Sequence, residues 1–476
     1  MDARRIRPTV PYRRRFRWIV DATIPVALIT TAGVGVLLPI SLAAEARISL
    51  FAFSLAVILW STTSINATYS ALVSMMVLVL MGGASQDRLY DSLASDVVWL
   101  MIGAFVIGGA IQHTGLAVRL TQLIVTRARS VRGVFWLVTM LLIPLSFFIP
   151  STSGRAAISI PIFQSITSAA DDRRVTRALA LLMPTVILVA TVTSLIGAGS
   201  HLIANDLLNQ VAKQKISFLE WMLYGLPFGI AASCVSCGVI LFMFLDQPTR
   251  SRELHLPALT RRPLNRGERL TLVTVGTMTV LWITEELHGL GIATVTVAGG
   301  LLLMSPGFGV VSWKDGLKTI SWNLVIFVGA ALVLGEALIE TGAAEWIIGQ
   351  VFTVSGVGES ESELLILLGL AFISLTSHVY MTSHSARVAA LVPALLYLGM
   401  NLNLNPVAVM FIGTVGMDYC LTFPVSSKAL LMFQEMEGET YHPSDLLRLS
   451  SVLLLVHVLL IVAAYYGYWR WIGLEL

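Results

Sequence analysis

Two stretches of matching sequence decide the fold: Pro150-Ser151-Thr152-Ser153-Gly154-Arg155-Ala156-Ala157 and, with its first serine 232 positions later, Ser383-His384-Ser385-Ala386-Arg387-Val388-Ala389. In each, small hydroxyl residues precede one arginine, and a proline (Pro161 or Pro393) follows ten residues after the first serine. Each stretch lies between two apolar segments that are too short to be comfortable separate membrane spans. Two unrelated polar loops would not be expected to share this spacing. We therefore predict two re-entrant hairpins whose tips meet inside a membrane and hold an anion.

The composition predicts a polytopic helical membrane protein. Of the 476 residues, 56% are hydrophobic and only 12% are charged, whereas about a quarter of the residues of a soluble protein are charged. Many apolar runs approach the ~20 residues that cross a bilayer as a helix, and a β-barrel would show short alternating segments instead. The expected fold is all-α, with about eleven transmembrane helices plus two re-entrant hairpins in two inverted-topology repeats.

The two halves of the chain repeat the same order of segments. Ile58-Leu59-Trp60-Ser61-Thr62 corresponds to Val280-Leu281-Trp282-Ile283-Thr284, and an interrupted apolar span follows each hairpin. Such paired halves with broken segments are typical of secondary transporters. The predicted segments are a basic cytoplasmic tail (1–18), a first repeat (19–245) with an inward-side hairpin (134–166) and a broken span (178–208), a cytoplasmic linker (246–268), a second repeat (269–434) with an outward-side hairpin (364–398) and a broken span (406–433), and a final span (449–476).

The distribution of basic residues predicts the orientation in the cell (inner or plasma) membrane. With a cytoplasmic N-terminus, 23 of the 31 Lys and Arg residues fall in predicted cytoplasmic segments and 5 in outer ones. Arg132 and Arg173-Arg174 flank the first hairpin, which places its ends inside. The second hairpin follows Glu359, Glu361 and Glu363, which places its ends outside. The two tips are therefore expected to approach each other from opposite faces.

Three cations remain, and they lie on the two hairpins and on the second broken span: Arg155, Arg387 and Lys428. A cation at mid-bilayer costs roughly 2.5–3.5 kcal/mol on insertion scales, so it needs a partner or a function. Asp418, the one acid near them in these apolar segments, can neutralise at most one of the three. This excess of positive charge predicts a small anionic substrate.

The tips offer the groups that bind an oxyanion. The N-terminus of each returning limb presents free N–H groups and the positive end of the helix dipole, and an arginine in the first turn can grip an oxyanion in bidentate fashion. The hydroxyl groups can cap the limb or face a ligand. The predicted substrate-binding residues are Ser151, Thr152, Ser153, Arg155, Ser383, His384, Ser385 and Arg387. At the breaks, Gly197, Gly199 and the interruption at Pro424 free backbone carbonyls that could coordinate a small cation.

Several other functions lack the motifs that they need. There is no P-loop, so ATP is not the expected energy source, and there is no HExxH motif and no convincing nucleophile cluster, so no enzyme is predicted. Cys234 and Cys237 form a lone CxxC without a partner pair, which disfavours a zinc site. No cofactor is expected, and sodium ions are left open as possible coupling ions. The expected partners are the substrate and the lipid bilayer, without nucleic acid.

At these residues the chain resembles the divalent anion/sodium symporter family, solute carrier family 13, within the ion-transporter superfamily. That family carries a Ser-Asn-Thr motif at each tip, where this chain has Ser151-Thr152-Ser153 and Ser383-His384-Ser385. The resemblance implies a homodimer whose transport domain moves like an elevator against a scaffold domain, and a di- or tricarboxylate or sulfate as the substrate. It also implies where a coupling ion, or a charge that replaces it, is held: Gly197, Gly199, Ser200, Thr422, Ser426, Lys428 and Asp418.

The chain departs from the family pattern where sodium would be bound. Both tip asparagines are absent, and His384 and Lys428 place nitrogen atoms where oxygen ligands would serve sodium. Sodium symport, proton coupling and anion exchange all stay open, and the protein cations slightly favour sodium-independent transport. A different branch of the superfamily, such as an arsenite or cation/proton permease, is a related alternative, and a membrane-embedded enzyme is an alternative of another class.

Overall fold

The computed structural model describes residues 13–38, 42–63, 65–116, 128–254, 263–344, 362–436 and 438–476, together with Arg119, Trp346 and Gln350. The first twelve residues of the predicted tail, residues 255–262 of the predicted linker, and Glu359 and Glu361 lie outside this part of the chain. Within it, all regular secondary structure is helical, apart from one isolated antiparallel bridge between Ser130 and Glu253. The prediction of an all-α fold is confirmed.

Among the described residues, seven helices are long and apolar enough to cross a membrane. They are α2 (Ala44–Thr62), α5 (Asp96–Thr114), α9 with its 3-10 extension (Arg173–Thr193), α11 (Phe218–Phe244), α17 (Trp322–Glu340), α19 (Glu363–Tyr380) and α23 (Pro443–Gly467). Shorter apolar helices include α3 (Ala67–Leu80), α15 (Ile292–Leu303) and α21 (Pro406–Val415). The chain is therefore polytopic. The number of eleven spans, and the side of the membrane on which each loop lies, stay predictions.

Each segment predicted as a hairpin contains two helices joined at a short polar tip. In the first, α7 (Val131–Leu142) and the 3-10 turn η2 (Pro144–Phe147) lead into the tip, and α8 (Thr152–Ala170) returns. In the second, α19 leads in and α20 (His384–Asn401) returns. Each returning helix begins at a serine whose hydroxyl accepts a backbone N–H three residues on: Ser151 from Gly154, and Ser383 from Ala386. The serine caps thus fix where each tip ends.

Both predicted broken spans are interrupted helices. In the first, α9 gives way to the 3-10 turns η3 (Ala190–Thr193) and η4 (Leu195–Gly197), and α10 (Gly199–Ala212) follows. The α-helix therefore ends at Val189, several residues before Gly197 and Gly199, where the break was predicted. In the second, α21 ends at Val415, and the turn η5 (Pro424–Ser426) precedes α22 (Lys428–Gln434).

Each returning limb packs against both broken spans. α8 contacts α9 of its own repeat and α22 of the other, while α20 contacts α21 of its own repeat and α10 of the other. This exchange places both tips and both breaks around one point of the molecule. In the most apolar part of α9 and its 3-10 extension, 94% of the residues are buried inside the protein, so this segment forms the centre of the packing.

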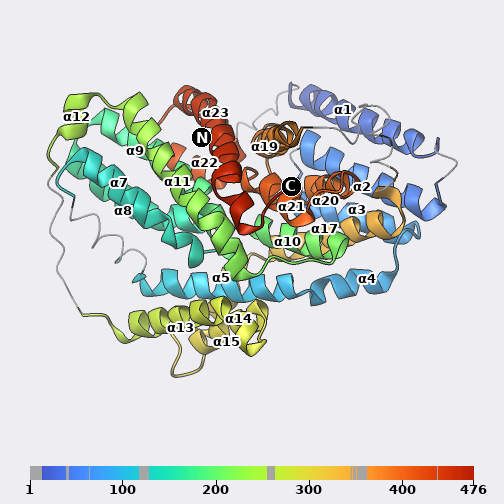
Figure 1. Cartoon of the computed structure of the whole chain (residues 1–476), viewed down its shortest axis with the longest axis horizontal. Helices are drawn as coiled ribbons and strands as arrows, with labels where there is room; N and C mark the ends of the chain where they lie inside the picture. The colour runs from blue at the N-terminus through green and yellow to red at the C-terminus, as the bar shows by residue number, and fades with distance from the viewer. Residues whose placement is uncertain are drawn as a thin grey trace, which may run out of the picture.

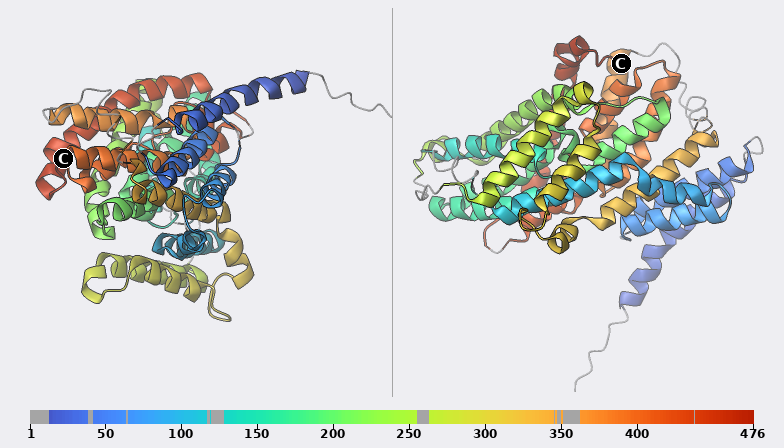
Figure 2. Two further views of the ribbon diagram at one scale, coloured as in Figure 1. Left: turned by 90° about the vertical axis from the view of Figure 1, so that its right-hand side faces the viewer. Right: turned by 90° about the horizontal axis from the view of Figure 1, so that it is seen from below.

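The remaining helices surround this centre. They are α1 (Arg13–Gly35), α4 (Gln86–Asp91), η1 (Ser92–Ala94), α12 (Gln247–Ser251), α13 (Arg266–Ile283), α14 (Glu285–His288), α16 (Trp313–Thr319) and η6 (Trp469–Ile472). α13 and α15 form an antiparallel pair that lies along α5 at one edge of the molecule (Figure 1). α1 contacts α2 and extends away from the rest of the bundle (Figure 2).

Candidate substrate cavity

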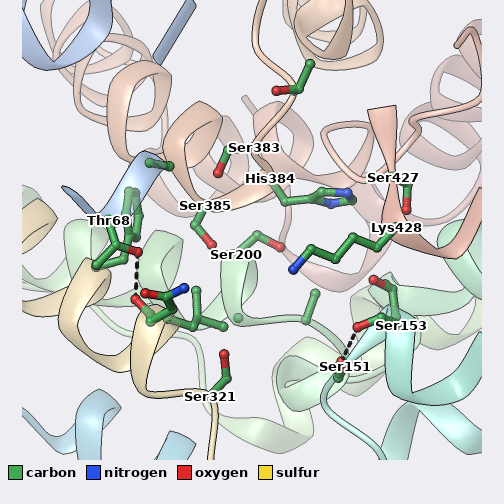
Figure 3. A pocket seen from close by; sticks show the side chains of 18 of the residues that line it. Thr68, Ser151, Ser153, Ser200, Ser321, Ser383, His384, Ser385, Ser427 and Lys428 are labelled. Atoms are coloured by element: carbon green, nitrogen blue, oxygen red, sulfur yellow. Dashed lines mark hydrogen bonds between the residues drawn. The ribbon is translucent and has the colours of Figure 1, made fainter. Parts of the chain in front are cut away.

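A cavity of about 430 Å³ lies where the two tips and the two breaks meet. Its wall contains Pro150 to Ser153 from the first tip, Thr382 to Ser385 from the second, Ala198 to Ser200 from the first break and Val425 to Lys428 from the second. Figure 3 shows side chains from both halves of the chain converging on it. The structure thus brings together six of the eight predicted substrate-binding residues, with Arg155 and Arg387 as the exceptions.

The tip hydroxyls serve the backbone and the cavity at once. Ser151 Oγ accepts from the Gly154 N–H at 3.2 Å and lies 3.0 Å from Ser153 Oγ. Thr152 and Ser385 also line the cavity, and neither side-chain hydroxyl forms a hydrogen bond with another described residue. These groups offer several hydroxyl donors and acceptors to a ligand from two sides.

Lys428 and His384 are the only ionisable side chains among the described residues that line the cavity, and no carboxylate lines it. Lys428 is the first residue of α22, its side chain is exposed, and it points into the cavity between the two tips (Figure 3). No ion pair is described for its ammonium group. The wall therefore presents positive charge to whatever enters.

Both tip arginines are buried behind the cavity wall and do not line it. Arg155 and Arg387 each have no exposed surface. Arg155 donates from Nη2 to the Gly197 carbonyl oxygen at 2.8 Å, and Arg387 donates from Nη2 to Cys420 Sγ at 2.9 Å. In both, Nε and Nη1 have no hydrogen-bond partner in the described structure. The expectation that these guanidinium groups grip the substrate directly does not match their placement in this conformation.

Among the described residues, the partners of Asp418 are two histidines and a serine, and they include neither an arginine nor a lysine. Its buried carboxylate is 2.8 Å from His201 Nε2 and 2.8 Å from His384 Nδ1, and it accepts from Ser200 Oγ at 3.1 Å. The pairing with Lys428 that we considered from the sequence is absent among these contacts. Asp418 instead joins α10, the second tip and the second break.

Several groups expected at a coupling-ion site already have protein partners. The Gly197 carbonyl accepts from Arg155, the Ser200 hydroxyl donates to Asp418, and the Thr422 hydroxyl lies 2.7 Å from His378 Nε2, away from the cavity. Ser426 and Gly199 line the cavity, as does Lys428. In the part of the chain that the structure describes, no three His, Cys, Asp or Glu side chains are arranged to hold a metal ion. Protein side chains thus contact Gly197, Ser200 and Thr422, which are three of the residues expected to hold a coupling ion.

One wall of the cavity was not predicted. Asn66 and Thr68 at the start of α3, and Ser321 and Asn323 at the start of α17, face the tips from the other side. Thr68 Oγ1 donates to the Asn323 carbonyl at 2.8 Å, which ties the two helix starts together. The helix-start signal of Asn66 is visible in the sequence, because its side chain caps α3. Nothing local in the sequence shows that these starts lie opposite the tips.

Comparison with known proteins gives the family. The family described as "Sodium:sulfate symporter transmembrane region" matches residues 20–475. Among curated relatives, a "Membrane protein" of Cupriavidus necator is 25% identical over 91% of this chain and 89% of its own. The "Citrate/succinate antiporter" of Escherichia coli K12 is 23% identical over 69% of this chain and 70% of its own. The "Sodium-dependent dicarboxylate transporter SdcS" of Staphylococcus saprophyticus is 23% identical over 77% and 76%.

A solved structure shares the fold. The Alcanivorax borkumensis YdaH transporter aligns with a TM-score of 0.51 and 14% identity, over 91% of this chain and 99% of that one. This likeness concerns the fold alone. Because the family match spans nearly the whole chain, the resemblance expected from the tips is confirmed, and so is the prediction of a transporter and not an enzyme: the chain belongs to the sodium:sulfate symporter family of membrane transporters.

Proposed function

We propose that the protein is a secondary active transporter of small multivalent anions, which it binds in the cavity between the two tips. The observation that carries this is the charge of the cavity wall: Lys428 and His384 line it among the described residues, and no carboxylate does. A cavity of about 430 Å³ lies within the ~300–1,000 Å³ of small-molecule sites. The ammonium group would repel a cation and would attract an anion more strongly than an uncharged substrate.

The substrate class that we propose is a di- or tricarboxylate, with sulfate as a second candidate. Two of the relatives are named for citrate, succinate or dicarboxylates, and the family is named for sulfate. The tips supply Ser151, Thr152, Ser153, Ser383 and Ser385 as hydroxyl groups for the oxyanion, and Lys428 supplies the charge. Arg155 and Arg387, behind the wall, contribute positive charge without direct contact.

We further propose that transport is sodium-independent and proceeds by alternating access. Fixed cations occupy both breaks, Arg155 on the Gly197 carbonyl and Lys428 at the start of α22. The tips and breaks pack against one another and would move together, as the elevator mechanism needs, while α3 and α17 supply the opposite wall. Symport with another ion and anion exchange stay open at this level. We also propose that the protein is a homodimer, that its N-terminus lies in the cytoplasm, and that its two halves are inverted repeats.

Uptake into proteoliposomes tests the function. Purified protein should take up radiolabelled succinate, citrate or sulfate, and a thermal-shift screen of the same anions should raise the melting temperature for those that are transported. Protein-free liposomes give the background. Failure of every di- and tricarboxylate, of sulfate and of sulfonates to bind or to enter, with correctly folded protein, would refute the proposal.

A further inference from the structure

The hydrogen bonds around Asp418 require a proton that the side chains do not hold in their ordinary states. His201 approaches the Asp418 carboxylate with Nε2 at 2.8 Å and the Ser194 carbonyl oxygen with Nδ1 at 3.2 Å. His384 approaches the same carboxylate with Nδ1 at 2.8 Å. Both partners of His201 are oxygen atoms, and the carbonyl can only accept. Each of the three contacts therefore needs one proton.

Three contacts need three protons, but two neutral imidazole rings and a carboxylate carry only two. The trio of His201, Asp418 and His384 thus holds one additional proton, either on the His201 ring or on the Asp418 carboxyl group. The surroundings fit this assignment. His201 lies against the Trp221 ring at 4.8 Å between centroids, where a positive imidazolium is favoured. The side chains of His201 and Asp418 are only 2% and 3% exposed, so bulk water has little access to a missing bond.

We infer that this trio is a proton-binding site and that the coupling ion of transport is a proton. The inference rests on the proposed anion transport and deepens it. With the additional proton the trio is neutral, and without it the trio carries one negative charge. His384 lines the cavity and contacts Asp418, so this charge would lie behind the cavity wall. A negative charge there offsets the positive charge of Lys428 and weakens anion binding, so anion and proton are expected to bind together.

The trio also joins the parts that must move together. Ser194 and His201 belong to the first broken span, Asp418 to the second, and His384 to the second tip. Loss of the additional proton removes one of the three bonds among them. Protonation would therefore both admit the anion and fasten the tip to the breaks.

Other charged groups face the trio and set its behaviour. Arg155 from α8 interacts electrostatically with Asp418, and Lys428 from α22 lines the same cavity as His384. Arg387 from α20 and the Cys420 thiol lie at the other side of His384, whose Nε2 is 3.5 Å from Cys420 Sγ. His378 from α19 interacts with His384 as well. These positive neighbours favour the ionised form of the Asp418 carboxylate. We therefore assign the additional proton to the His201 ring and not to Asp418.

The first test is the pH dependence of anion binding, measured with anions that stay divalent. Sulfate and 1,2-ethanedisulfonate do not titrate near neutral pH, so any slope belongs to the protein. Their dissociation constants should rise by up to about tenfold per pH unit as the proton is lost, which is the limit for linkage to one proton. His201→Gln should flatten this slope. His457→Gln is the matched control, because His457 is buried, donates to the Leu453 carbonyl and has no partner at Nε2, so it needs one proton only.

The outcomes separate the two proposals. If anions bind with a dissociation constant that is the same at every pH, or if His201→Gln keeps the full slope, the proton site is refuted while anion transport stands. If no anion binds, the proposed function fails. Nuclear magnetic resonance of ¹⁵N-labelled histidines in anion-free protein then tests the proton directly. Two N–H nitrogens are expected on His201 and one on His457, and a bare His201 nitrogen beside an ionised Asp418 would overturn the inference.

Discussion

Arg155 donates from Nη2 to the carbonyl oxygen of Gly197 at 2.8 Å, so the arginine of the first tip binds the first break and not the cavity. Its side chain has no exposed surface, and Nε and Nη1 have no hydrogen-bond partner in the described structure. Such a buried cation gives the site a permanent positive charge at a carbonyl that would otherwise be free to bind an ion. The bond also fastens α8 to the break between α9 and α10.

Arg155→Met should therefore reduce stability more than it reduces substrate affinity. The change removes a charge-assisted hydrogen bond, worth about 1.5–3 kcal/mol, and leaves the Gly197 carbonyl without this donor. Thermal unfolding and the dissociation constant for succinate or sulfate separate the two effects, and Arg155→Lys should recover part of the lost stability. If melting is unchanged while binding disappears, Arg155 is a direct ligand after all.

Gly197 is expected to tolerate no side chain. A Cβ atom at this position would overlap the Thr191 carbonyl oxygen, and backbone can move away only by opening the turn between η3 and η4. Gly197→Ala should lower the free energy of unfolding by about 1–3 kcal/mol or more, as overpacking does, and should abolish uptake. Gly238→Ala in α11 is the control, since nothing lies within 4 Å of its Cβ and alanine favours a helix. Equal melting temperatures for both variants would show that the break is not held as described.

Lys428 is expected to supply most of the charge that binds the substrate. At about 4 Å, an ammonium group attracts one negative charge by ~4 kcal/mol at an effective dielectric of ~20 and by ~1 kcal/mol in water. Lys428→Gln should therefore weaken anion binding by about tenfold to a thousandfold, while the fold survives because the side chain is exposed. Lys314→Gln, at an exposed lysine of α16, should change nothing. Unaltered affinity in Lys428→Gln would remove Lys428 from the site.

The sequence was sufficient to predict the tips and the breaks, because local features set them. Hydroxyl residues that can cap a helix end one limb and start the next, as Ser151 and Ser383 do. Residues that interrupt a helix, such as those before Gly199, act locally, so their effect can be predicted from the sequence. These are backbone effects within a few residues, and they fix where the cavity can form.

The direction of the side chains could not be predicted in the same way. Arg155 and Arg387 are the fourth residues of α8 and α20, whereas Lys428 is the first residue of α22. Which face of a returning limb turns toward the cavity depends on its packing against the broken spans. The pairing of His201 with Asp418 is likewise a tertiary contact, between residues more than 200 positions apart.

Transport should not require sodium. The Gly197 carbonyl is occupied by Arg155, and the Lys428 ammonium group stands at the other break. A sodium ion about 4 Å from that ammonium group would be repelled by ~4 kcal/mol at an effective dielectric of ~20, which is close to a thousandfold in affinity. Uptake by proteoliposomes should therefore be the same when choline replaces sodium, at fixed pH and with counter-anion loaded inside. Lys428→Gln serves as the companion variant, because it removes the ammonium group that would repel sodium at the second break, so any sodium stimulation of residual uptake is expected in this variant and not in the wild type. Near-complete loss of wild-type uptake in choline, restored steeply by added sodium, would instead establish sodium symport and show that the fixed cations do not replace the ion.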